Sequence, residues 1–233
     1  MKRTRKIKQR RCARRHSSLL GFLSAGLCAS SLVAAGNQAA AAATHQAAGA
    51  PSSLAQVLSL LRAQERSTFQ ASYAMVGTSG RTAATFTVYH RNKDYRIDTA
   101  HTVALVLGAS GYSCTTGQAH PTCVKMNPIV AESLVTGVVP GPLIDQFAAI
   151  QSGRLAGITV STSRRTIGGQ HATCLIVKQQ SGATTYAVTY CVTPKVIAYV
   201  GTSAGSIRLT HFSGSVAASL FALPKGAVVS SAP

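Results

Sequence analysis

The sequence is poor in the residues and patterns from which most active sites are built. Asp and Glu number only five in 233 residues, and a two-carboxylate hydrolase could draw at most on Asp94 and Asp98, which flank basic residues beside a turn. No G-x-S-x-G, H-E-x-x-H, phosphate-binding-loop or dinucleotide-binding pattern is present. The histidines of the predicted strands are dispersed: His90, His101, His171 and His211. We therefore predict a protein that is not an enzyme and holds no cofactor.

Cysteine patterns for metal binding and redox chemistry are missing too. Cys114 and Cys123 lie nine positions apart, which is not a zinc-ligand spacing, and no C-x-x-C accompanies them. Thiol–disulfide exchange sites use that same C-x-x-C pattern. His120, between the two cysteines, is interpreted as a polar loop residue. We predict no metal site, which leaves disulfide bonding as the role of the cysteines.

The first 43 residues have the pattern of an export signal. Residues 1–15 carry nine Lys and Arg and no acid, residues 19–35 are mostly apolar, and a run of small residues, AAGNQAAAAAT, follows. A basic start, an apolar middle and a small-residue exit are typical of a secretory signal peptide. We predict a signal peptide or N-terminal anchor at 1–43, an Ala-rich linker at 44–52 and one domain at 53–230.

Several fates of this leader stay open. It can be cleaved, or it can remain as a membrane anchor, since its apolar stretch is near the lower limit for a membrane span. Lipidation at Cys28 is disfavoured because Leu27, not a small residue, precedes it. A twin-arginine route at Arg14-Arg15 is disfavoured because serines follow where apolar residues are expected. Each fate places the domain outside the cell or on the outer face of its envelope.

The formal charge of +18 overstates how basic the exported part is. Nine of the 23 Lys and Arg residues belong to the leader, which leaves 14 against all five acids, or about +9. That charge favours anionic lipid or polymer surfaces. Apart from Arg164-Arg165 the cations are scattered singly, with no basic run interleaved with aromatics. We therefore predict no nucleic-acid partner.

Hydrophobic periodicity predicts one helix followed mostly by strands. The stretch SSLAQVLSLLRAQERS has leucines and a valine at helical spacing, which predicts a helix over about 53–66. From Thr68 the period changes to two. The predicted strands include ATFTVYHR, YRIDT, TVALVLG, GYSC, GITVSTSRRTI, HATCLIVKQQ, TTYAVTYCV, VIAYVG and SIRLTHF. Two short helices are predicted between 128 and 153, and the tail SLFALPKGA is predicted to be irregular.

Two turns fix strand registers. A two-residue loop at Asn92-Lys93 sets Val88 opposite Ile97, and it sets His90 opposite Tyr95, which keeps the apolar faces together. Gly168-Gly169 is a second hairpin signal. The sum predicts an α+β domain dominated by antiparallel sheet, with helices collected on one side.

A third turn predicts the disulfide pairing. Gly182-Ala183 suits a two-residue hairpin loop with Gly at the first central position. Counting back seven rungs puts Cys174 opposite Cys191 at a non-hydrogen-bonded pair, where Cα atoms lie about 4.5 Å apart, within the reach of a disulfide. The other two cysteines of the exported part, Cys114 and Cys123, then pair with each other. An even number of cysteines suits an oxidising compartment.

Three stretches together resemble a family: FTVYHRNKDYRIDT, the cysteine-closed YSCTTGQAHPTCVKM, and the C-terminal run from YCVTPKVIAYVG to FALPKGA. They are similar to the bacterial lipoprotein-carrier superfamily, which includes periplasmic Lol-type carriers, mycobacterial envelope lipid carriers and a periplasmic stress sensor. The resemblance covers about residues 54–228. Two features depart from the family: the sequence lacks a good lipidation motif, and the disulfide pair is not general to the superfamily.

The resemblance implies a curved antiparallel sheet that forms an unclosed half-barrel, with helices covering its concave mouth and an apolar space for acyl chains between them. The candidate cavity-lining residues on the sheet and the lid are Phe86, Val88, Ile97, Val103, Leu105, Leu143, Ile144, Phe147 and Ile150. The alternative is that the same side chains fill an ordinary core, and periodicity does not separate the two.

The leading hypothesis is an exported, monomeric, non-enzymatic protein that holds a lipid or acyl chain in an apolar cavity and carries it across the cell envelope. Its expected partners are a lipid or acylated ligand, with a membrane surface or an envelope protein as a further partner. The alternative is an envelope sensor or interaction module of the same fold that binds a protein. The sequence names neither the cargo nor its donor and acceptor.

Overall fold

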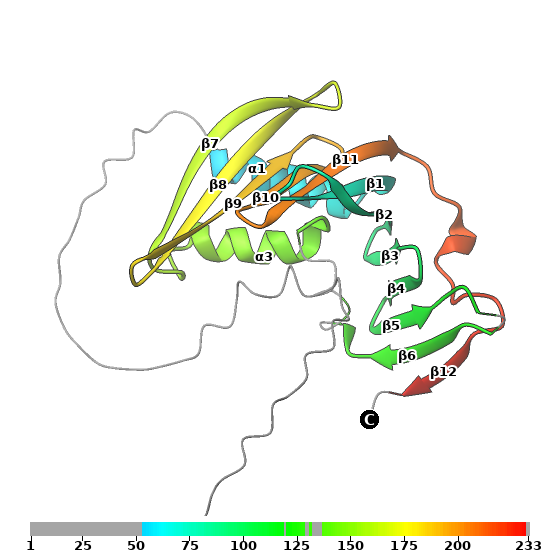
Figure 1. Cartoon of the computed structure of the whole chain (residues 1–233). Helices are drawn as coiled ribbons and strands as arrows, with labels where there is room; N and C mark the ends of the chain where they lie inside the picture. Colours follow the sequence, from blue (N-terminus) through cyan, green and yellow to red (C-terminus); the bar gives the residue numbers. More distant parts are fainter. Residues whose placement is uncertain (1–52, 119, 129–130, 132–136, 232–233) are drawn as a thin grey trace, which may run out of the picture. The chain divides into compact units, whose positions relative to one another are not determined.

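The computed structural model describes residues 53–231 except 119, 129–130 and 132–136. The predicted leader at 1–43 and linker at 44–52 lie outside the described residues. A single sheet of 12 strands has the order β12-β6-β5-β4-β3-β2-β1-β11-β10-β9-β8-β7. Figure 1 shows β7 and β8 as a long hairpin at one edge of the sheet, and β12 beside β6 at the other.

The elements follow the predicted strands closely. The first half of the sheet consists of β1 (Thr68–Gly77), β2 (Thr82–Arg91), β3 (Asp94–Asp98), β4 (Thr102–Leu107), β5 (Ser110–Thr115) and β6 (Thr122–Met126). The second half consists of β7 (Ile158–Ile167), β8 (Gln170–Ser181), β9 (Thr184–Val192), β10 (Ile197–Thr202), β11 (Gly205–Ser213) and β12 (Val228–Ser231). The helical elements are α1 (Ser53–Glu65), α3 (Pro140–Gln151) and the 3-10 turn η2 (Ala218–Leu220).

The expected fold class is wrong. The described part of the chain is mostly β, one large open sheet of 12 strands with two α-helices, and not an α+β half-barrel with helices covering its mouth. The period-two pattern predicts most strands correctly, but β6 and β12 lie where no strand is predicted. How a sheet bends depends on twist and on bulges, such as the register shift between Ser72 and Tyr73, and the pattern does not encode these.

The predicted hairpin registers are confirmed. Val88 pairs with Ile97 and His90 pairs with Tyr95 across the two-residue turn, where Asn92 adopts a φ of 56°. Asparagine tolerates this left-handed conformation, which type I′ hairpin turns require. Local turn chemistry therefore sets the pairing at the centre of the sheet.

The two α-helices pack together on one side of the sheet. The helix predicted over 53–66 is observed as α1, and the second of the two short helices predicted between 128 and 153 is α3; most of the first lies outside the described residues. α1 also contacts β8 and β9. Leu58 and Leu61 of α1 join Leu143 and Phe147 of α3 in the main hydrophobic core. None of the helices in the described ranges is both long and apolar enough to span a bilayer.

We call the side of the sheet that carries this main core the inner face, and the other side the outer face. Val88 and Ile97 point to the inner face and belong to the core. The outer face of β4–β6 has a smaller core of its own, formed by Val103, Leu105 and the Cys114–Cys123 cystine. Leu223 packs on this core, and it belongs to residues 214–231, which we call the C-terminal segment.

The C-terminal segment is held on the outer face by polar and aromatic contacts. Arg96 Nη1 donates to the carbonyl oxygen of Leu220 at 3.1 Å, while its Nε and Nη2 donate to the Asp98 carboxylate at 2.6 and 3.0 Å. The Arg91 guanidinium lies 4.5 Å from the ring centroid of Phe221. The Arg96–Asp98 pair is thus part of the anchor of this segment, which ends in β12 paired parallel with β6.

Candidate functional site

The nine predicted cavity-lining residues fall into three groups. Four fill the main core with at most 8% of their surface exposed: Val88, Ile97, Leu143 and Phe147. Three are half-buried at the boundary of that core: Phe86, Ile144 and Ile150. The remaining two, Val103 and Leu105, lie elsewhere. A ligand can reach only the half-buried group without displacing the core.

Val103 and Leu105 lie on the outer face. Register places Ala104 opposite Ile97, so Ala104 faces inward while its two neighbours pair with Asp98 and Arg96. Side chains alternate along a strand, and Val103 and Leu105 accordingly join the outer cluster with the cystine. The structure therefore does not bring them together with the other seven residues.

The inner face becomes progressively less covered toward β6. One row of directly paired residues crosses β2 to β6, namely Val88, Ile97, Ala104, Ser113 and Val124. Val88 is 0% exposed and Ile97 8%, the next two are half-buried, and Val124 is 37% exposed. Apolar side chains thus recur past the edge of the core, at Ala104 and Val124, with Ser113 between them.

We define the inner-face apolar patch as five apolar residues on β2, β4, β6 and α3 that are not fully buried: Phe86, Ala104, Val124, Met126 and Ile144. All but Val124 pack as partly buried side chains against the main core. Ala104, Val124 and Met126 are absent from the predicted set. Ala104 lies in a strand that is apolar on both faces, so alternation does not show which way it points, and Val124 and Met126 lie on β6, for which no strand is predicted.

Tyr73 supports Phe86 from the adjacent strand. Their rings stack with centroids 5.2 Å apart, and Tyr73 is directly opposite Phe86 in the ladder. The Tyr73 hydroxyl donates to the carbonyl oxygen of Ile197 at 2.9 Å, and burial raises the pKa of Tyr73 far above its usual value. The phenol is therefore neutral and fixed, and it holds Phe86 in place.

His90 is a second buried titratable group on the inner face of the sheet. It is 0% exposed and lies between Phe69 and Tyr95, whose ring centroids are each 4.8 Å away. Burial lowers the pKa of His90 to about 4, although nearby backbone groups of Ser67 and Asn92 and the Asp94 carboxylate partly oppose the shift. Neither ring nitrogen of His90 has a partner at hydrogen-bonding distance and angle among the described residues. His90 is thus a neutral core residue.

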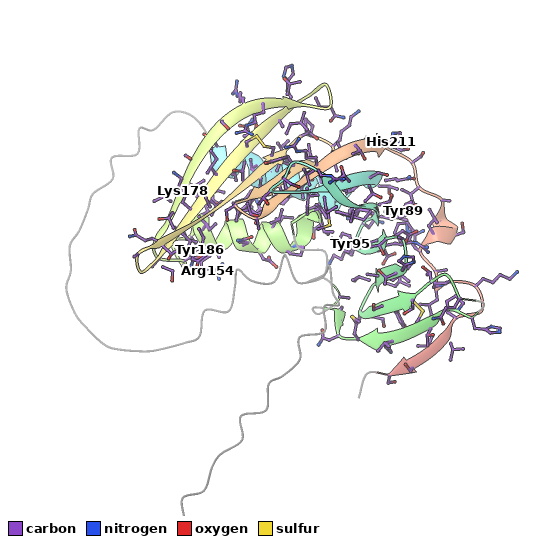
Figure 2. All side chains as sticks on the ribbon, viewed as in Figure 1. Tyr89, Tyr95, Arg154, Lys178, Tyr186 and His211 are labelled. Atoms are coloured by element: carbon purple, nitrogen blue, oxygen red, sulfur yellow. A yellow bond between two sulfur atoms is a disulfide. The ribbon has the colours of Figure 1, made fainter. Side chains whose placement is uncertain are left out.

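The other histidines of the predicted strands are apart from His90. His101, His171 and His211 are exposed. Figure 2 shows His211 on β11, away from Tyr95, the residue that contacts the His90 ring. Among the described residues no three or more His, Cys, Asp or Glu side chains cluster as metal ligands would.

Both predicted disulfides are confirmed. Cys114 and Cys123 pair directly opposite each other on β5 and β6, with Cα atoms 4.0 Å apart. Cys174 and Cys191 do the same on β8 and β9 at 3.9 Å, as the register count predicts. Both appear as yellow bonds in Figure 2. Two disulfides are compatible with an exported or extracellular protein.

Comparison with known proteins identifies no family. No family model matches the chain, and no curated protein matches it. Among solved structures, a chain of PNGF-II matches with a TM-score of 0.42 and 10% sequence identity, over 71% of this chain and 32% of that one. The chain thus spans about a third of the PNGF-II chain, and a likeness this low carries no argument. The resemblance to lipoprotein carriers stays a prediction.

Proposed function

We propose that this is an exported, non-enzymatic binding protein that holds an acyl chain of a lipid against its inner-face apolar patch. The observation that carries the proposal is the graded exposure of the inner face, from 0% at Val88 to 37% at Val124. Apolar side chains continue there beyond the part that the helices bury. Such exposed apolar surface is typical of a binding site.

The chemistry of the patch suits an acyl chain. Its five side chains carry no charged or hydrogen-bonding group, and an acyl chain needs none, because each buried CH₂ contributes about 0.8 kcal/mol. About six buried methylenes would therefore contribute roughly 5 kcal/mol before the cost of ordering the chain. The excess of cations in the exported part further favours an anionic lipid over a neutral one.

Placing an amide in the patch is expected to weaken acyl-chain binding. In Ile144→Asn, a polar group that the acyl chain cannot satisfy replaces an apolar one, and affinity for a fluorescent fatty acid is expected to fall at least tenfold, about 1.4 kcal/mol or more. Fluorescence titration measures this change. Leu155→Asn, a change of the same type at an exposed residue of the loop after α3, is the matched control and is expected to leave affinity unchanged.

Native mass spectrometry of gently purified protein provides the independent test. Co-purifying lipid supports the proposal. Absence of both co-purified lipid and fatty-acid binding would contradict it, and would instead favour the alternative of an envelope interaction module that binds a protein.

A further inference from the structure

A pocket of about 490 Å³ lies between the first turn of α1 and the β7–β8 hairpin, at the opposite edge of the sheet from β6. None of its lining residues belongs to the inner-face apolar patch. Its polar lining consists of Gln56, Arg164, Arg165, Thr166, His171 and Thr173.

Strand pairing brings these side chains together. Arg164 lies directly opposite Thr173, and Thr166 lies directly opposite His171. Residues two apart on a strand share a face, so these four are on one face of the hairpin. The turn beside them is Gly168-Gly169, with φ values of 57° and 76°, which only a pair such as Gly-Gly adopts without strain. The hairpin thus holds the group in fixed register.

The lining is cationic without compensation. It includes Arg164 and His171 on one face of the hairpin but no carboxylate, while the Arg165 side chain points to the opposite face, beside Ala172. Of the four acids in the described ranges, Asp94 and Asp98 already form ion pairs with Arg91 and Arg96. Within those ranges no hydrogen bond or ion pair engages the side chains of the pocket's two arginines, so their donors face solvent.

The first turn of α1 adds to this potential. Gln56 belongs to that turn and lines the pocket. The N-terminal end of a helix carries the positive end of its dipole. Together with the cations of the hairpin, this end of α1 creates a local preference for negative charge.

We propose that this pocket binds a phosphate-bearing ligand through Arg164, with Thr166, His171 and Thr173 beside it on the same face. The planar donor forks of arginine match phosphate oxygens, and the hydroxyls of Thr166 and Thr173 add neutral donors. The volume lies within the range of small-molecule sites and exceeds that of bare phosphate, so the ligand is an organic phosphate, either soluble or the head group of a lipid. The proposal does not depend on acyl-chain binding at the other edge of the sheet.

Calorimetric titration of the full exported protein with sn-glycerol 3-phosphate tests the proposal. Saturable binding is expected, and Arg164→Gln is expected to weaken it at least tenfold. Arg81→Gln removes the same charge from an exposed arginine outside the pocket and is expected to change affinity less than twofold. Equal weakening in both variants, or no saturable binding of any phosphate probe, would overturn the proposal.

Vesicles distinguish the two sources of phosphate. Binding to phosphatidylglycerol vesicles but not to phosphatidylcholine vesicles, lost in the Arg164→Gln variant, identifies a lipid head group; binding of glycerol phosphate alone identifies a soluble ligand. NMR of the unsubstituted protein supplies a readout that does not require a variant to fold. The His171 ring signals are expected to shift saturably with glycerol phosphate, and binding without such a shift would place the ligand elsewhere.

Discussion

Replacing Cys174 and Cys191 together with alanine is expected to lower the melting temperature of the protein by about 6–12 °C. The bond closes a loop of 17 residues, and in the loop-entropy model its removal costs about 3 kcal/mol. A domain of this size shifts by roughly 2–4 °C per kcal/mol. Calorimetry or thermal circular dichroism of the variant and the unsubstituted protein measures the difference.

The surroundings of the Cys174–Cys191 cystine indicate that the lost stability comes mainly from the entropy of the unfolded chain. Both cysteines are 0% exposed and belong to a small outer-face cluster with Ala172, against which Ile167 and Tyr199 pack. Alanine introduces no new polar group there, so the lost cross-link accounts for most of the effect. An unchanged melting temperature would show that the unfolded chain is already restricted without the bond.

The cystine Cys114–Cys123 serves as the matched comparison, because it differs in what it supports. It closes a loop of nine residues, so the loop model gives a slightly smaller loss of about 2.5 kcal/mol. It also underlies the outer cluster on which the C-terminal segment packs, and Cys123 pairs with Val229 of β12. Its replacement by alanines is therefore expected to loosen β12 as well.

Limited trypsin digestion separates the two variants. Lys225 is exposed in the segment that precedes β12. At 25 °C, cleavage after Lys225 is expected to accelerate in Cys114→Ala/Cys123→Ala, because local opening of the segment limits the reaction. The Cys174→Ala/Cys191→Ala variant is expected to be cleaved there at the unsubstituted rate. Equal acceleration in both would mean that cleavage follows global unfolding.

The sequence predicts strand register best where two strands are joined by a short turn. The positions of Asn92 and Gly182 determine which residues face each other in two hairpins, and the Cys174–Cys191 bond follows by counting along the strands. These registers are local, because a two-residue loop permits one pairing that keeps the apolar face buried.

The sequence does not predict two features of the sheet: which way side chains point in a strand that is apolar on both faces, and which strands pair when they are far apart in the chain. TVALVL in β4 is apolar on both faces, so alternation does not show that Ala104 faces inward while Val103 and Leu105 face outward. The reason lies in the C-terminal segment, more than 100 residues later, which covers the outer face there. No turn in the sequence indicates the parallel pairing of β12 with β6, because the two strands are far apart in the chain.

The second large effect is expected on acidification, through His90. The ring is buried in the folded protein, where its pKa is lowered from 6.5 to about 4. Between these values the unfolded chain binds a proton that the folded protein does not, so stability falls as pH falls. The stability that comes from keeping the His90 ring neutral is fully present above about pH 6.5. It decreases by up to about 1.4 kcal/mol per pH unit below that, and the total loss near pH 4 is on the order of 3 kcal/mol.

Few other groups mask this loss above pH 5. The described residues include only four carboxylates, and carboxylates titrate mainly below that range. His101, His171 and His211 are exposed, so folding changes their surroundings less than those of His90. Urea unfolding at pH 7.5 and pH 5.0 is therefore expected to show a drop in the free energy of unfolding of about 2 kcal/mol, most of it from His90.

His90→Phe is expected to remove most of that drop. Phenylalanine fits the slot between Phe69 and Tyr95, retains the ring stacking and has nothing to protonate. His211→Gln, which removes an exposed histidine from β11, is expected to retain the drop. If His90→Phe loses as much stability between the two pH values as the unsubstituted protein, the acid sensitivity originates elsewhere. If it loses little, the cost of charging one buried imidazole sets the lower pH limit of the fold.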